Sequence, residues 1–333
     1  MLLPNAFRLL ELQSRVAGAA SSALPSQNIY QFPDVGTWLE NIAVRPNGDL
    51  LVTMLSPTPS LYTLKQPYSS SREFSLLHTF DNATGLLGIT ETSDDTFAII
   101  STKLTDGTVP VPGSSAIWEV AFSSNTVNTR KIASLPQLEL PNGATLSIPG
   151  STGVLIADCL GGTVTRCDTQ TGATEVVLQR AETMPIPNEA ESLGINGMHY
   201  QNGYLYWSNT ALVSIYRIRV DSNGIPIANA AVETVGKINA SFVDDFALDS
   251  AGTSWVATNP NNTVVALRSD GSSQIVLGDP SKLTVAGVTA GAFGRTTYDS
   301  KTLYVTTNGA IRAPVNGVTE PAKIVAVDTS SFA

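Results

Sequence analysis

The stretch ENIAVRPNGDLLVT, residues 40–53, sets one apolar run before a Pro-Asn-Gly-Asp turn and a second apolar run after it. Two such runs around a glycine-containing turn are typical of a β-hairpin. The pattern recurs about every fifty residues, with turns of different length, at Leu87–Ile100, Asn142–Ala157, Asn196–Trp207, Asp244–Ala257 and Gly291–Thr306. A repeat of this period indicates equivalent supersecondary units. Six copies therefore predict six units.

A third strand is predicted after each hairpin, and a fourth after five of them. The third strands are Ser60–Leu64, Ala116–Val120, Thr163–Cys167, Ser214–Ile218, Thr263–Leu267 and Lys323–Val327. The sixth unit lacks a fourth strand of its own, and the run Asn28–Phe32 before the first copy can supply it. Closure of this kind removes open sheet edges. We therefore predict an all-β, six-bladed β-propeller with four antiparallel strands per blade, closed by the N- and C-terminal strands; a β-sandwich is the alternative.

The repeats also define the domain organisation. We expect residues 28–333 to form a single propeller domain and residues 1–27 to be an N-terminal extension. Residues 5–17 have the spacing of a short amphipathic helix, but charged residues at positions 8, 11 and 15 interrupt the apolar segment that a signal peptide needs. The extension is therefore either a short helix or a processed leader.

Composition narrows the functional classes. The 333 residues are 42% hydrophobic and 14% charged, which excludes charge-driven disorder. With 19 basic against 28 acidic residues, the net charge of −9 argues against nucleic acid and favours a small-molecule partner. No apolar run reaches the ~18 residues of a membrane span, so we expect a soluble protein. Three Asn-x-Ser/Thr triplets, starting at Asn82, Asn239 and Asn261, leave the secretory pathway, the extracellular space and the cytoplasm open as locations. The oligomeric state is not predicted.

Two cysteines, Cys159 and Cys167, flank the glycines at 161–162. If these glycines form a tight turn, residue 159 faces Val164 and residue 167 faces Ile156, so the sulfurs do not lie opposite each other. We expect two buried or half-buried free thiols, with a disulfide as the alternative. No Cys/His cluster has the spacing of a zinc site.

The residues that open the first strand of each repeat are predicted to be neighbours, because the inner strands of a propeller converge on one mouth of its channel. These positions hold Glu40, Leu87, Asn142, Asn196, Asp244 and, in the sixth repeat, Gly291. Carboxylates and amide carbonyls are hard oxygen donors that suit Ca²⁺ or another divalent ion. Each residue alone is more typical of a turn or a strand cap. The shared position of Glu40, Asn142, Asn196 and Asp244 favours a common polar site.

Residues around these positions resemble a known superfamily. The set Leu39-Glu40, Asn142-Gly143, Ile195-Asn196-Gly197, Val243-Asp244 and Gly252–Ala257 is similar to the gluconolactonase, senescence-marker-protein and luciferin-regenerating-enzyme propellers. This resemblance implies a divalent ion, usually calcium, held by Glu40, Asn142, Asn196 and Asp244, with Asp244 assisting hydrolysis of a sugar lactone. The chain departs from the pattern at Asn41, where members usually have Gly, and at Val243-Asp244-Asp245, where they have Pro-Asp-Gly. These departures indicate a rebuilt pocket.

A closer resemblance is to a fungal branch of these propellers that includes hetero-Diels-Alderases of tropolonic sesquiterpenoid biosynthesis. It is carried by Tyr30–Pro33, Trp38–Arg45, Ala83–Ile89, Asp244–Asp249 and Thr258–Val264. The resemblance implies a reaction between an o-quinone methide, derived from a tropolone, and a cyclic terpene alkene. Such a cycloaddition depends on positioning and on exclusion of water, so it requires no cofactor. One Ca²⁺ or another divalent ion is the alternative.

These considerations define the expected site. We expect Asp244, Glu40, Asn196 and Asn142 to act on the substrate, or to hold the metal if one is present. We expect the pocket walls to include Trp38, Met198, His199, Tyr200, Asp245 and Phe246, although each aromatic residue could instead pack between blades. Side chains alternate along a strand, so His199 and Asn196 should lie on opposite faces unless a bulge intervenes. His199 is therefore expected in the pocket only if such a bulge is present. A calcium-dependent lactonase or esterase and a non-catalytic scaffold are the alternative functions.

Overall fold

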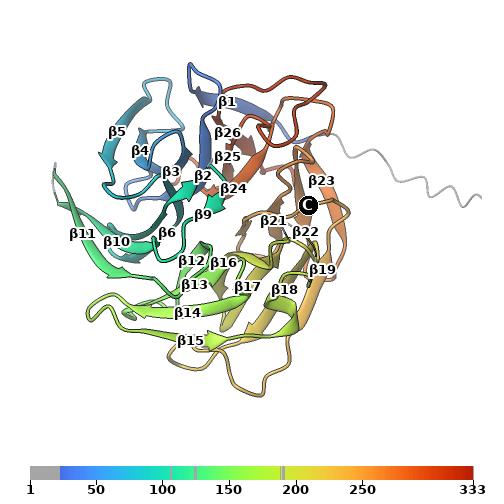
Figure 1. The fold of residues 1–333 in the computed structure, drawn as a ribbon. Helices are drawn as coiled ribbons and strands as arrows, with labels where there is room; N and C mark the ends of the chain where they lie inside the picture. The colour runs from blue at the N-terminus through green and yellow to red at the C-terminus, as the bar shows by residue number, and fades with distance from the viewer. Residues whose placement is uncertain (1–22, 106, 124–125, 188, 190–191, 333) are drawn as a thin grey trace, which may run out of the picture.

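The computed structural model describes residues 23–105, 107–123, 126–187, 189 and 192–332. These residues form six four-stranded antiparallel sheets, arranged as blades around an axis (Figure 1). The predicted six-bladed propeller is confirmed, and the β-sandwich is excluded. The helix predicted at residues 5–17 lies outside the described residues.

Each of the first three blades runs from an inner strand beside the axis to an outer strand. Blade 1 consists of β2 (Trp38–Val44), β3 (Leu50–Ser56), β4 (Ser60–Lys65) and β5 (Glu73–Thr79). Blade 2 consists of β6 (Gly85–Ser93), β7 (Thr96–Thr102), β10 (Ala116–Ser123) and β11 (Thr126–Ser134). Blade 3 consists of β12 (Pro141–Leu146), β13 (Gly153–Asp158), β14 (Thr163–Asp168) and β15 (Thr174–Leu178).

The other three blades follow the same order, except that the outer strand of blade 6 comes from the start of the chain. Blade 4 consists of β16 (Ile195–Gln201), β17 (Tyr204–Asn209), β18 (Ser214–Arg219) and β19 (Glu233–Lys237). Blade 5 consists of β20 (Phe246–Leu248), β21 (Ser254–Ala257), β22 (Thr263–Leu267) and β23 (Ser273–Gly278). Blade 6 consists of β24 (Val288–Phe293), β25 (Thr302–Thr307), β26 (Lys323–Asp328) and β1 (Ser26–Gln31).

In the part of the chain that the structure describes, two short elements lie outside the blades. A hairpin of β8 (Leu104–Thr105) and β9 (Val109–Pro110) is inserted between β7 and β10 of blade 2. A single 3-10 turn, η1 (Ala181–Thr183), lies between blades 3 and 4. Among the described residues, no helix is long and apolar enough to cross a membrane.

The ring is closed as the sequence predicts. β1 pairs antiparallel with β26, so that Ser26 lies opposite Val327 and Gln31 opposite Lys323. The closing strand thus begins two residues before the predicted run Asn28–Phe32. Because both ends of the chain contribute to one sheet, blade 6 has the same four strands as the others.

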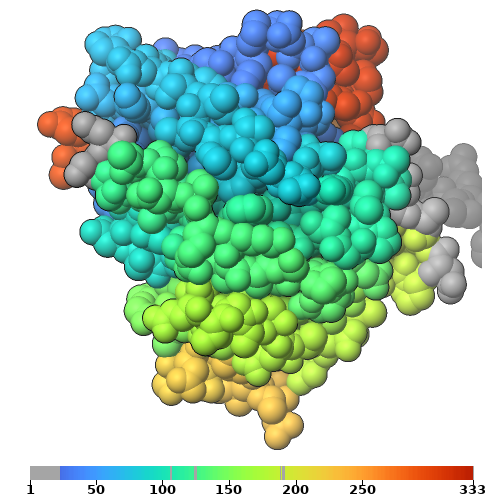
Figure 2. Space-filling model, turned by 60° about the vertical axis from the view of Figure 1, so that its left-hand side comes forward, coloured from blue at the N-terminus to red at the C-terminus, as the bar shows by residue number. Residues whose placement is uncertain are grey.

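The hydrophobic core lies between neighbouring blades. One cluster joins blade 6 to blade 1 through Tyr304, Ile324 and Leu39, which are fully buried. Both faces of a sheet are covered in this arrangement, so strands such as Leu50–Ser56 are almost continuously apolar. Figure 2 shows the result at the surface, where consecutive blades form adjacent bands from blue through green to yellow-green.

Glycines let the inner strands approach each other at the axis. A Cβ atom on Gly143 would lie 2.2 Å from the carbonyl oxygen of Asn196, and one on Gly197 would lie 2.0 Å from Oδ1 of Asp245. Any side chain at these positions would push the strands apart. Since Asn142-Gly143 and Asn196-Gly197 lie within β12 and β16, the turn interpretation of these dipeptides is excluded.

The two cysteines are both free and buried, as expected. The expected register between their strands is wrong by two residues, because Cys167 lies opposite Val154 rather than Ile156. The physical reason is the length of the turn: Asp158 pairs with Thr163, so the loop spans residues 159–162 and not the two glycines alone.

Candidate functional site

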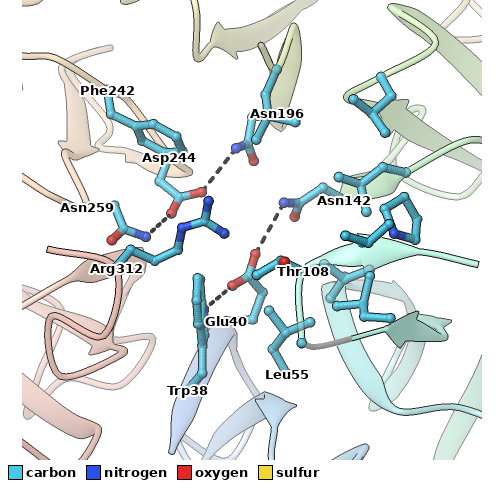
Figure 3. A pocket seen from close by; sticks show the side chains of 18 of the residues that line it. Trp38, Glu40, Leu55, Thr108, Asn142, Asn196, Phe242, Asp244, Asn259 and Arg312 are labelled. Carbon is cyan, nitrogen blue, oxygen red and sulfur yellow. Dashed lines mark hydrogen bonds between the residues drawn. The ribbon is translucent and has the colours of Figure 1, made fainter. Parts of the chain in front are cut away.

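The four polar residues predicted to share a site line one pocket (Figure 3). They are Glu40, Asn142, Asn196 and Asp244. The strand geometry gives the reason. In β12, Pro141 and Ala144 pair with β13 while the residues between them do not, and β16 has the same irregularity between Ile195 and Met198. Such a bulge redirects the side chain that follows the paired residue. It turns Asn142 and its equivalents toward the pocket.

Glu40 is one of the two carboxyl groups among these four residues, and it is buried. Asn142 donates from Nδ2 to Glu40 Oε1 over 3.2 Å, and Trp38 donates from Nε1 to Oε2. Burial raises the pKa of Glu40 to about 7, and the nearby Asp245 carboxyl acts in the same direction. The two hydrogen bonds oppose this shift because they favour the charged form.

Asp244 is the other carboxyl group and is equally enclosed. Asn196 donates from Nδ2 to Oδ1 over 3.1 Å, and Asn259 donates from Nδ2 to Oδ2 over 2.9 Å. Burial, followed by repulsion from Glu40, raises the pKa of Asp244 well above its ordinary value. The pocket floor therefore holds two carboxyl groups that both resist ionisation.

An apolar chamber of about 610 Å³ opens above this floor. Its size is that of a typical small-molecule pocket. Its walls are largely leucine, at positions 55, 87, 104, 140, 160 and 193. The β8–β9 hairpin contributes part of the rim through Thr108, Val109 and Pro110, and Val109 is 59% exposed. The chamber can therefore hold an apolar ligand against a polar floor.

Only one of the six residues expected in the pocket walls lines the pocket. Trp38 lines the pocket, whereas Met198, His199, Tyr200, Asp245 and Phe246 are not among its lining residues. Met198 and Phe246 are fully buried in two separate core clusters between blades. The bulge in β16 turns Asn196 into the pocket, and the residues after it continue away from the pocket along the strand.

His199 and Asp245 form a second polar cluster deeper along the axis. His199 Nε2 lies 3.0 Å from Asp245 Oδ1, and Asn41 donates from Nδ2 to Asp245 Oδ2 over 2.8 Å. The ring of His199 packs edge-on against Phe246. These contacts join blades 1, 4 and 5 below the pocket floor.

In blade 6, the residue equivalent to Asn142 and Asn196 is Thr289 and not Gly291. The sequence interpretation of the sixth repeat was therefore wrong. Val288 pairs with Thr307 before a register irregularity, just as Ile195 pairs with Asn209 in β16. The side chain of Thr289 is buried and donates to the Leu39 carbonyl. The sequence did not mark this position, because the sixth repeat has no polar residue where the repeat spacing places one, at Gly291.

Sequence analysis did not single out Asn259 or Arg312, two polar residues that line the pocket. Asn259, which hydrogen-bonds Asp244, lies in the segment Thr258–Val264 that carries the family resemblance, and this was the available signal. Arg312 lines the pocket from the loop between β25 and β26, and no repeat or motif marks it.

The donor set fits a hard divalent ion. Glu40 and Asp244 provide carboxylates, and Oδ1 of Asn196 is buried with no hydrogen-bond partner. Rotation of the Asn142 amide would present a fourth oxygen. An ion held by these four residues would supply Lewis-acid polarisation of a carbonyl oxygen.

A scan against models of known protein families found no match. Similar solved structures include the calcium-binding protein regucalcin of Agrobacterium tumefaciens, with a TM-score of 0.61, 15% identity and coverage of 92% of this chain and 95% of that one. A gluconolactonase from Xanthomonas campestris has a TM-score of 0.61 at 13% identity, covering 92% and 91%. These similarities, at identities of 13–15%, establish the fold alone, a six-bladed β-propeller.

Two curated proteins are more similar in sequence. A "Putative hetero-Diels-Alderase" from Phoma sp. is 33% identical, over 92% of this chain and 93% of its own length. A protein of the same description from Sarocladium schorii is 30% identical, over 94% and 86%. The chain belongs to this hetero-Diels-Alderase family, and the resemblance stated from the sequence is confirmed.

Proposed function

We propose that this protein catalyses an intermolecular hetero-Diels-Alder cycloaddition between a tropolone-derived o-quinone methide and the alkene of a cyclic terpene. The observation that carries the proposal is the pocket: an apolar chamber that ends on two hydrogen-bonded carboxyl groups. The names of the two curated relatives support the reaction class.

The first step is the loss of water from a tropolone that carries a hydroxymethyl group. Glu40, as the neutral acid, gives its proton to the leaving hydroxyl, and the C–O bond breaks. The ring hydroxyl has already lost its proton to the solvent on binding, so a proton from the solvent restores the Glu40 acid. One water molecule leaves and the o-quinone methide forms, with no net change in the protein. General acid catalysis of this kind contributes about 10²–10⁴-fold.

The second step is the cycloaddition. The oxygen and the exocyclic carbon of the o-quinone methide each form a σ bond to one alkene carbon, while the π electrons of both partners rearrange. No electron passes to a cofactor, so the step needs none. The apolar walls hold the reactants in contact and exclude water, which would otherwise add to the quinone methide.

The experiment that tests this proposal supplies a hydroxymethyl tropolone and humulene to the purified protein and follows the cyclised product by chromatography with mass detection. We expect one stereoisomer in excess over the uncatalysed mixture. Asp244→Asn and Glu40→Gln should reduce the rate, while the surface variant Lys65→Gln should not. A product ratio equal to that of the uncatalysed reaction would refute the proposal.

A calcium-dependent lactonase is the second candidate, favoured by the orphaned Oδ1 of Asn196. The test measures metal content after purification without added divalent ions, and lactone hydrolysis with and without chelator. About one calcium per chain, together with hydrolysis that chelation and Asp244→Asn both abolish, would favour this candidate over the cyclase.

A further inference from the structure

The loop between β25 and β26 is anchored to the body of the propeller by backbone and apolar contacts. Ala310 is buried, and its backbone N–H donates to the carbonyl of Ala286. Ala310, Ala286 and Val315 form an apolar cluster beneath the loop. The loop is therefore anchored on both sides of Arg312, although Arg312 itself is exposed.

The backbone of this loop has the conformations that such anchoring requires. Gly309 has a φ of 72° and Ala310 a φ of 60°, both in the left-handed region. A Cβ atom on Gly309 would collide with the carbonyl oxygen of Glu320 on the returning part of the loop. The tight path is thus specified locally, which is unusual for a loop that only connects strands.

The start of the loop is also tied to the pocket floor. Asn308 donates from Nδ2 to Asn259 Oδ1 over 3.1 Å, and Asn259 donates from Nδ2 to Asp244. All three side chains are buried. A displacement of the loop would therefore disturb the carboxyl group that Asn259 contacts.

From this anchored loop, Arg312 reaches into the pocket. Figure 3 shows its guanidinium pointing into the space between Asp244, Asn142 and Glu40. Among the pocket-lining residues that the structure describes, Arg312 is the only basic side chain. A cation above a floor of carboxyl and amide groups gives one end of the pocket an affinity for anionic oxygen.

We propose that Arg312 is the residue that binds and orients the two adjacent oxygens of the tropolone partner. This assignment rests on the proposed function. A guanidinium presents parallel N–H groups in one plane and forms paired hydrogen bonds with two coplanar oxygens that share a negative charge. Ionised tropolone has such a pair on neighbouring ring carbons. The leucines that line the pocket remain available to the hydrocarbon partner.

Binding of tropolone itself tests this assignment without catalysis. The full-length protein is titrated calorimetrically with tropolone at a pH at which tropolone is ionised. In parallel, the ultraviolet spectrum of bound tropolone reports whether it is held as the anion. We expect Arg312→Gln to weaken binding by about 10- to 100-fold and to remove the spectrum of the bound anion, because charge-assisted hydrogen bonds are lost.

Two controls separate binding from structural damage. Arg312→Lys keeps the charge but not the planar fork, so it should recover only part of the affinity. Tropone, which lacks the hydroxyl group, should bind weakly and equally to the parent protein and to Arg312→Gln. Arg219 is exposed at the end of β18 and does not line the pocket, so Arg219→Gln should bind tropolone like the parent.

The outcomes distinguish this inference from the proposed function. Tropolone affinity that is unchanged in a folded Arg312→Gln protein would overturn the assignment, even if cycloaddition is observed. Cycloaddition without measurable tropolone binding by the parent protein would also overturn it. Tropolone binding that depends on Arg312, in a protein that yields no cyclised product, would keep the assignment and remove the proposed function.

Discussion

The floor and the rim of the pocket are built in different ways. Floor residues such as Asn142 and Asn196 sit at equivalent bulges of successive inner strands, so their positions are set by the register of the whole ring. Rim residues such as Val109 and Arg312 come from insertions that individual blades carry. The floor is therefore inseparable from the fold, whereas the rim can change without it. Stability should follow the floor, and selectivity should follow the rim.

The largest effect is expected where the floor meets the packing of the blades. In Gly143→Ala, the new methyl group would lie 2.2 Å from a backbone oxygen of the next blade. We expect destabilisation of about 3 kcal/mol, a fall in Tm of about 5–10 °C and loss of activity. Gly291→Ala is the matched control, because its nearest neighbours are side-chain carbons at 3.2 Å and 3.3 Å, which can move. Equal melting curves for the two variants would contradict the packing argument.

The next effect concerns chemistry on an intact floor. Glu40→Gln keeps the size of the side chain but removes the acid, so the rate should fall by about 100-fold with little change in Tm. Product formation under single-turnover conditions measures this change. A rate within twofold of the parent would assign Glu40 a structural role only.

The same residue predicts a pH dependence. Because the folded-state pKa of Glu40 is raised to about 7, the neutral acid predominates below that pH. The rate should therefore fall as the pH rises through about 7, and Glu40→Gln should lack this limb. Stability should change in the same direction: the contribution of the neutral acid is complete below the ordinary carboxyl pKa and is lost as the pH rises through about 7. Paired rate and melting profiles check both statements.

A smaller effect is expected at the rim. Val109→Asp places a charge on an exposed residue of the β8–β9 hairpin, so Tm should shift by less than about 2 °C. The charge faces the apolar chamber, and we expect KM for the hydrocarbon partner to rise by about 10-fold. Steady-state kinetics with each partner varied in turn would show whether the tropolone KM changes less.

The smallest effect is expected from removal of divalent ions. Since the proposed cycloaddition uses only positioning and proton transfer, treatment with chelator should change its rate by less than about twofold. Rates before and after dialysis against chelator provide the measurement. A large loss that calcium restores would move the floor from a hydrogen-bonding role to a metal-binding one.

The contrast between floor and rim also explains what the sequence could predict. The polar opening positions recur at a regular spacing, so their convergence followed from the repeat alone. The sixth position failed because Thr289 occupies it without a matching sequence signal. Met198 and Phe246 were assigned to the pocket because they neighbour floor residues in sequence, but both side chains are buried in core clusters between blades. Arg312 lies in an insertion, where no periodicity operates.

The closing strand has a consequence for how this protein is made. Ser26 pairs with Val327, so about 300 residues separate the two partners. Joining points so distant in a flexible chain costs about 5 kcal/mol of loop entropy, far more than a local hairpin. During synthesis, blades 1 to 5 can form as they emerge, but β1 has no partner until β26 leaves the ribosome. Closure of the ring therefore has to wait until β26 has been made, after the strands of the other five blades.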